Sequence, residues 1–98
     1  MEANVAALRA GPAGHPALAR YAEAAVLLTG DPGAAIEDGI AWVRQTLALL
    51  DIPGLGAFGL VPEQAADIAA RAQRSSSMRG NPVALSEDDL RAILARAA

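Results

Sequence analysis

The sequence predicts a single all-helical domain, a compact bundle of about five helices. Three observations support this. No segment alternates apolar and polar residues as a half-buried strand would, and glycine and proline divide the 98 residues into helix-length segments. Several of these segments also repeat apolar residues every three or four positions. Because a chain of this length forms one domain rather than two, we expect one domain over residues 1–98.

The first two predicted helices are separated by a glycine- and proline-containing break. Residues 1–10 are rich in alanine, and residues 11–15 (GPAGH) interrupt them. Residues 16–29 have the apolar spacing of a second helix, and Gly30 follows as a natural residue for its C-terminal turn.

The third predicted helix has the strongest pattern. We expect Asp31 to cap its N-terminus and Pro32 to take its first position. One apolar stripe is formed by Ile36, Ile40, Val43, Leu47 and Leu50. A neighbouring strip is formed by Ala35, Trp42 and Leu49. We therefore expect a central helix that is buried on more than one side. Gly39 inside it costs about 1 kcal/mol relative to alanine, which indicates close approach of another backbone.

The C-terminal half is predicted to hold two more helices. Residues 51–60 (DIPGLGAFGL) contain three glycines and a proline, which indicates a loop or one irregular turn. Pro62 opens the next helix. Its buried stripe is predicted to consist of Ala65, Ile68, Ala69 and Ala72.

The last helix has a clear start signal. We expect Ser86 to be the N-cap and Asp89 to complete a capping box, with Leu85 packed on Leu90. The apolar face of this helix is predicted to consist of Leu90, Ile93, Leu94 and Ala97.

Composition excludes several classes of function. The chain has no cysteine, so it has no disulfides and no thiolate metal sites. Its net charge is −3, and its eight cations are scattered arginines, which provide no basic stripe for nucleic acid. The apolar runs are too short to cross a bilayer, and no basic segment precedes an apolar one at the N-terminus. We therefore expect a cytoplasmic protein without nucleic-acid or membrane partners.

The predicted core is thin. Of the 98 residues 25 are alanine, whose methyl group removes little area from water at roughly 25 cal/mol per Å². The aromatic residues are Tyr21, Trp42 and Phe58. A chain of this size with so thin a core is marginally stable alone, which indicates a partner surface or a missing domain.

The titratable residues favour structural roles. His15 lies in the break at residues 11–15 with no acid nearby in sequence, so we expect an exposed loop histidine rather than a catalytic base or metal ligand. Glu37 and Asp38 fall on the polar side of the third helix. The acids at 87–89 lie in a first helical turn, where carboxylates stabilise the helix dipole.

Two further motifs resemble functional ones only in part. Gly54 and Gly56 form a G-x-G, but Gly59 comes one residue late for a dinucleotide fingerprint, and the segment follows a helix. Three serines at 75–77 lack the base and the orienting acid of a nucleophilic site. We expect a connector in the first case and no hydrolase chemistry in the second.

The C-terminal segment at 75–97, SSSMRGNPVALSEDDLRAILARA, resembles the ending of iron-containing (group III) alcohol dehydrogenases. In order along the chain, ALARYAEAAVLLTG at 17–30 resembles that family's R-Y-A-x-x-A-x-x-L-G helix, and residues 35–60 resemble its long helix that ends in I-P-x-x-L. Residues 1–4 resemble the stretch that follows the family's last metal histidine. Each motif is weak, and the specificity comes from their ordered succession over nearly the whole chain.

The resemblance implies the C-terminal helical domain of a two-domain enzyme with the dehydroquinate synthase-like fold. Such enzymes oxidise alcohols or reduce aldehydes with NAD(P) and a divalent metal, usually iron. The family's nucleotide loop and its metal ligands, one Asp and three His, correspond to positions before Met1. No catalytic, cofactor-binding or metal-binding residue therefore transfers to this chain. The resemblance does imply one wall of the substrate cleft, formed by Ser75, Ser76, Ser77, Met78, Arg79, Gly80, Asn81 and Pro82.

Other interpretations of the sequence stay open. The implied partner is an N-terminal nucleotide-binding domain, and a homo-oligomer is compatible with the sequence. The chain could instead be a free-standing helical protein-interaction module that docks a partner through its alanine-rich faces, or an inactive structural fragment. Glycerol-dehydrogenase-like and dehydroquinate-synthase-like relatives share the architecture, but the SMRGNP segment favours the iron-containing alcohol dehydrogenase branch.

Overall fold

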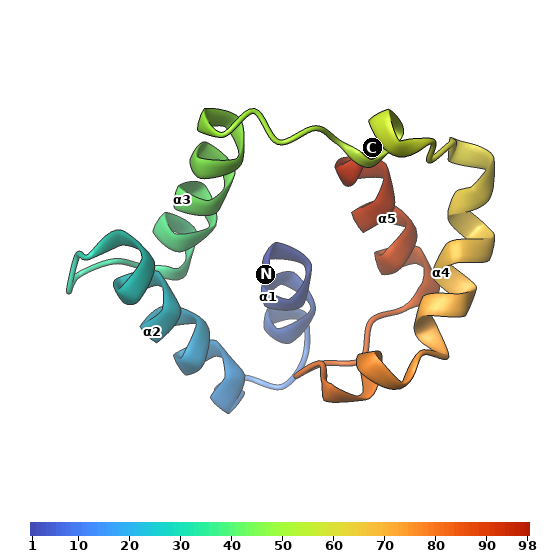
Figure 1. Ribbon diagram of the computed structural model, residues 1–98. Helices are drawn as coiled ribbons and strands as arrows, with labels where there is room; N and C mark the ends of the chain where they lie inside the picture. Colours follow the sequence, from blue (N-terminus) through green and yellow to red (C-terminus); the bar gives the residue numbers. More distant parts are fainter. The chain divides into compact units, whose positions relative to one another are not determined.

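The helices predicted from the sequence are present, and the chain contains no strand. The computed structural model describes residues 1–98 (Figure 1). The α-helices are α1 (Glu2–Ala10), α2 (Pro16–Thr29), α3 (Ile36–Leu49), α4 (Ala65–Gln73) and α5 (Glu87–Ala97). Three short 3-10 helices lie between them: η1 (Leu55–Phe58), η2 (Pro62–Gln64) and η3 (Ser76–Gly80). The predicted all-helical class is confirmed.

The contacts divide the chain into two compact units, residues 1–52 and 53–98. The division follows the end of α3. There Asp51 adopts a left-handed conformation with φ of 51°, and the Ile52 amide donates to the Leu47 carbonyl at an N···O distance of 3.1 Å. This hydrogen bond is that of a Schellman motif, which ends a helix, and Pro53 then prevents its continuation.

In residues 1–52, α2 packs against α1 and α3. The buried apolar side chains of this unit are Val5, Leu8, Ala25 and Ile36. Gly39 lies directly against α2: a Cβ atom built on it would come 2.7 Å from the Cβ and 2.9 Å from the Cα of Ala25. The close backbone approach that Gly39 predicted is therefore confirmed. The side-chain nitrogen Nδ2 of Asn4 also donates to the Tyr21 hydroxyl at 2.9 Å, and this hydrogen bond joins α1 to α2.

The predicted N-cap of the third helix is wrong. Asp31 instead begins a turn, in which its Oδ1 accepts from the Gly33 amide at 2.9 Å and its carbonyl from the Ala34 amide at 3.1 Å. With the Asp31 side chain engaged in this Asx-type turn, α3 begins only at Ile36. The Ala35 amide donates to Asp38 Oδ2 at 2.8 Å, so Asp38 supplies the side-chain contact at this end.

The predicted burial of α3 on more than one side is also wrong. Ile36 and Gly39 in its first turns are buried, but Trp42 is 39% exposed, Leu47 46% and Leu49 85%. The physical reason is that α2 approaches α3 most closely around Ala25 and Gly39, whereas no residue of α3 after Gly39 is buried. The apolar stripe of α3 is therefore partly exposed to solvent.

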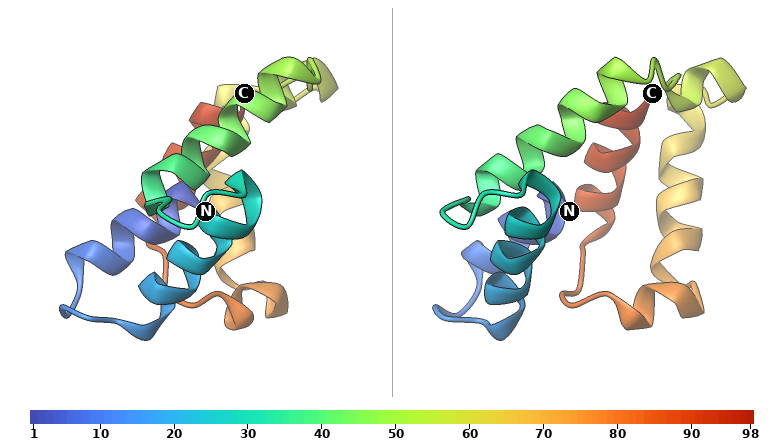
Figure 2. Two further views of the ribbon diagram at one scale, coloured as in Figure 1. Left: turned by 90° about the vertical axis from the view of Figure 1, so that its left-hand side faces the viewer. Right: turned by 60° about the vertical axis from the view of Figure 1, so that its left-hand side comes forward.

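In residues 53–98, α4 and α5 lie side by side and run in opposite directions (Figures 1 and 2). The buried apolar side chains of this unit are Ala69, Leu85 and Leu90. The segment expected to be an irregular turn forms η1, which contacts α5. A Cβ atom at Gly54 would collide with the carbonyl of Ala98, so this glycine permits the contact. In the chain as a whole, no helix combines the length and the apolar character needed to cross a membrane.

Candidate functional site

The segment at 75–82 folds into a defined turn before α5. Ser75 precedes η3, and its carbonyl accepts from the Met78 amide at 3.1 Å. Its hydroxyl lies 2.7 Å from the Ser77 hydroxyl. Ser76 and Ser77 are exposed, whereas Ser75 and Met78 are half-buried. The segment thus presents hydroxyl groups outward and directs one apolar side chain inward.

Hydrogen bonds also form at the end of this segment and in the chain that leads to α5. The Asn81 amide nitrogen Nδ2 donates to the Val83 carbonyl at 2.7 Å, and the Asn81 backbone amide donates to Met78 at 3.1 Å. The side chain of Gln73, the last residue of α4, donates to the Leu85 carbonyl at 3.4 Å. The segment therefore has a defined local conformation between α4 and α5.

A small hollow of about 200 Å³ lies beside this segment. It is lined by Gln73, Met78, Arg79, Val83, Ala84 and Leu85. The structure thus brings Met78 and Arg79 of the predicted cleft wall together. The three serines, Gly80, Asn81 and Pro82 do not line this hollow. Arg79 is exposed and forms no ion pair, unlike Arg9, Arg20, Arg44 and Arg71.

His15 is the N-cap of α2 rather than an exposed loop residue. It is half-buried, and its Nδ1 accepts a hydrogen bond from the Ala17 amide at 3.1 Å. The sequence expectation of an exposed side chain is therefore wrong, because the imidazole caps α2. The signal was present in the sequence, because Pro16 directly after it is typical of a first helical position.

The acids of α1 and α3 form ion pairs between these helices. Glu37 pairs with Arg9, and Glu2 with Arg44 at an N···O distance of 2.6 Å. The hydrogen bond from Arg9 lowers the pKa of Glu37 below its ordinary value, with a further contribution from the backbone. The two pairs flank a hollow of about 380 Å³ with Val5, Ala6, Ile40 and Ala41 in its lining. Its charges are compensated within the protein.

The acids at the start of α5 include the predicted capping box. The Asp89 amide donates to the Ser86 hydroxyl at 3.0 Å, and the Ser86 amide donates to Asp89 Oδ2 at 2.9 Å. The hydrogen bond from the Ser86 backbone amide, and after it one with the Ser86 side chain, hold the pKa of the Asp89 carboxyl below its ordinary value. The capping role predicted for these residues is confirmed.

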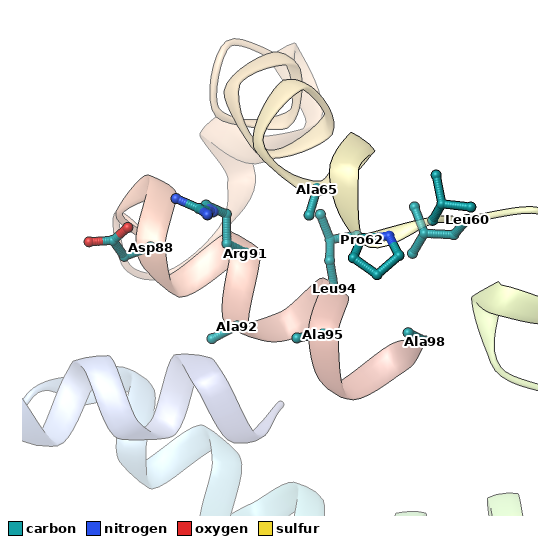
Figure 3. A pocket seen from close by; sticks show the side chains of 10 residues that line it. Leu60, Pro62, Ala65, Asp88, Arg91, Ala92, Leu94, Ala95 and Ala98 are labelled. Carbon is teal, nitrogen blue, oxygen red and sulfur yellow. The ribbon is translucent and has the colours of Figure 1, made fainter.

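An apolar groove that the sequence did not reveal lies beside α5 (Figure 3). Its volume is about 630 Å³. In Figure 3, Leu94 lies close to Pro62 of η2 and to Ala65 at the start of α4, while Asp88 and Arg91 lie toward the other end of the lining. The remaining lining residues are Leu60, Val61, Ala92, Ala95 and Ala98. The sequence could not show it, because Leu94 was assigned to the buried face of the last helix.

Nowhere in the chain do three His, Asp or Glu side chains lie together as potential metal ligands. The hydrogen bonds of the possible ligands agree with this. The Nδ1 atom of the one histidine accepts a hydrogen bond from a backbone amide, and the carboxylates of Asp38 and Asp89 cap helices. These residues therefore do not fit a metal site by themselves.

No protein-family model, curated protein or solved structure matches this chain.

Proposed function

We propose that this chain is the C-terminal helical part of an iron-containing alcohol dehydrogenase with the dehydroquinate synthase-like fold. In this proposal the segment at 75–82 forms one wall of the substrate cleft of a cytoplasmic enzyme. The nucleotide-binding domain, the NAD(P) site and the metal ligands belong to other parts of the enzyme. The chain is inactive by itself, because alcohol oxidation requires the nucleotide and the metal in the same cleft.

One observation supports the proposal: the segment at 75–82 has a defined turn conformation around η3. Within it the Ser75 carbonyl accepts from the Met78 amide, Asn81 Nδ2 donates to the Val83 carbonyl just after it, and the capped helix α5 begins at Glu87. A cleft wall needs such support, because substrate groups must be held in a fixed geometry during reaction. The ordered succession of family-like motifs along the chain is the second support.

A chimeric enzyme tests this function. Residues 1–98 replace the corresponding helices of an iron-containing alcohol dehydrogenase, and alcohol oxidation is followed by the absorbance of the reduced nicotinamide. We expect turnover that depends on Fe²⁺. A matched chimera in which a glycine–serine linker of equal length replaces residues 75–82 should keep nucleotide binding but show a raised KM for the alcohol. A folded chimera that binds both NAD(P) and Fe²⁺ and yet does not turn over would contradict the proposal.

A second function has its own supporting observation. The apolar groove beside α5 and the exposed side chain of Leu49 would suit a free-standing helical protein-interaction module. This alternative expects the isolated chain to be a stable monomer that forms a specific complex. Unfolding in urea, followed by circular dichroism, and light scattering across a range of protein concentrations separate it from a dehydrogenase part, which would be marginally stable alone.

A further inference from the structure

Helix α5 is the one α-helix whose charged side chains take no part in an ion pair. Two ion pairs join α1 to α3, and α2 and α4 each contain one. Helix α5 carries Glu87, Asp88 and Asp89 in its first turn and Arg91 and Arg96 further along, and all five residues are exposed. Asp89 caps the helix, and the other four charges have no ionic partner within the chain.

The exposed side of α5 between these charges is apolar. Ala92 and Ala95 are exposed and line the groove of about 630 Å³ beside the helix (Figure 3). Leu60, Val61 and Pro62 also line this groove, and Val61 is 45% exposed. Because alanine has only a methyl side chain, a second helix can approach such a surface closely. The groove and the alanines therefore form one apolar surface along α5.

The charges and the alanines of this surface are complementary to themselves. Asp88, Ala92 and Arg96 are spaced by one helical turn and so follow one another along the same side of α5; together with Ala95 they are called the α5 face. In an antiparallel pair of α5 helices whose two-fold axis passes near Ala92, Asp88 of each copy is level with Arg96 of the other, because both lie one turn, about 6 Å, from Ala92. A parallel pair would place Asp88 against Asp88 and Arg96 against Arg96.

We propose that the α5 face is the contact between two copies of this chain, paired antiparallel about a two-fold axis near Ala92. Asp88 of each copy binds Arg96 of the other, so the two ion pairs form together, as the symmetry of such a contact requires. The alanines meet at the centre, and the second copy removes part of the groove lining from water. Arg91 is offset around the helix from this line of residues, so its long side chain reaches water at the edge of the contact.

This contact does not depend on the dehydrogenase function. A second copy is the occupant that the charges favour, because the same face supplies both the acid and the base of each ion pair. Opposite charges at the edge of an interface set the orientation of the partner more than they set the affinity. Because one short helix and a groove form a small interface, we expect a weak dimer with a dissociation constant in the micromolar range.

Charge-reversed variants test the antiparallel pairing. Sedimentation equilibrium of the 98-residue chain measures dimerisation from low to high micromolar concentration at low ionic strength. Asp88→Arg makes both ends of the α5 face positive and Arg96→Asp makes both negative, so each variant alone should dimerise at least about tenfold more weakly. An equimolar mixture of the two variants should recover the affinity of the unchanged chain, because every ion pair between them joins opposite charges. Arg74→Asp, at an exposed arginine without an ion pair outside α5, is the control and should leave dimerisation unchanged.

Recovery in the mixture also shows that the two variants fold, because a misfolded chain would not regain its partner. A monomer at every concentration would overturn the second copy as the occupant of the α5 face. A dimer that neither single variant weakens would overturn the antiparallel pairing. So would a mixture that stays monomeric although both variants keep their helix content by circular dichroism.

A single cysteine provides a second test that leaves the charges in place. The chain contains no cysteine, so Ala92→Cys introduces one thiol near the proposed two-fold axis. Oxygen with a copper catalyst oxidises two such thiols to a disulfide, and non-reducing gel electrophoresis measures the covalent dimer. Ala66→Cys, at an exposed alanine of α4 that does not line the groove, is the matched control. We expect Ala92→Cys to cross-link several times faster than Ala66→Cys, and equal rates would overturn the proposal.

Discussion

Gly39 is the residue at which the local sequence and the packing are most directly connected. A glycine inside a strong helical pattern is unfavourable by itself, so its presence indicated that a backbone comes close. The structure provides that neighbour, since the fully buried Ala25 of α2 lies where a side chain on Gly39 would be. What the sequence could not specify was which helix would approach.

Replacing Gly39 with valine should destabilise residues 1–52 by about 1–3 kcal/mol, the usual cost of overpacking. The added side chain would meet both the Cβ and the backbone of Ala25, and backbone atoms move less easily than the end of a flexible side chain. Urea unfolding followed by circular dichroism measures the change. Ala48→Val, at an exposed position of the same helix, is the control. Equal stability of the two variants would show that the approach is looser than described.

His15 gives a second prediction for a single residue. His15→Ala should reduce stability by about 1 kcal/mol, because the Ala17 amide loses its side-chain acceptor at the start of α2. His15→Asn should restore most of this, since asparagine is among the preferred N-cap residues. Thermal unfolding of the three proteins at neutral pH measures the order. If asparagine were as destabilising as alanine, the cap would contribute little.

At the scale of elements, the sequence predicts the start of α5 correctly but not the start of α3. Helix α5 begins as predicted, because the side chains of Ser86 and Asp89 each accept from the other's backbone amide. Helix α3 does not, because Asp31 forms hydrogen bonds within its own turn and the actual N-cap, Ala35, has no side-chain acceptor. A cap is predictable when one local arrangement satisfies the polar groups, and ambiguous when a nearby turn can satisfy them equally well.

The capping box of α5 should make its helix content depend on pH in acid. Because the pKa of Asp89 is lowered in the folded protein, its carboxylate stabilises the fold above the pKa of the unfolded chain. That contribution is lost as the pH falls through the lowered folded-state pKa. Carboxyl-carbon NMR of Asp89 and the amide shifts of α5 follow the transition. Asp89→Asn should remove it, and Asp88→Asn, which is outside the capping box, should leave it in place.

At the scale of the whole molecule, the apolar residues divide into a small core and a large exposed set. Leu8→Ala should destabilise the protein by about 2–5 kcal/mol, because Leu8 is only 2% exposed. Leu49→Ala should change stability by less than about 0.5 kcal/mol, because Leu49 is 85% exposed. Denaturant unfolding of both variants gives the comparison. A large loss in Leu49→Ala would mean that a second copy or another surface covers it in solution.

The dehydrogenase proposal makes one prediction for the chain as a whole. Residues 1–98 alone should bind neither NADH nor Fe²⁺ stoichiometrically, because the proposal places the nucleotide loop and the metal ligands in other parts of the enzyme. Titration calorimetry with each ligand measures this, and the parent enzyme of the chimera provides the positive control. Tight stoichiometric binding of either ligand would refute our account of where the reactive groups lie.

The sequence by itself determined the helical class, the breaks between helices apart from the start of α3, and the cap of α5, because glycine, proline and capping residues act within a few positions of the backbone. It also identified the segment at 75–82 as distinctive, but it could not show that Arg79 borders an apolar hollow or that the later turns of α3 are exposed. Those features depend on which helix faces cover one another. The periodicity of an apolar stripe indicates that it can be buried, and only the tertiary arrangement decides whether a neighbour is there to bury it.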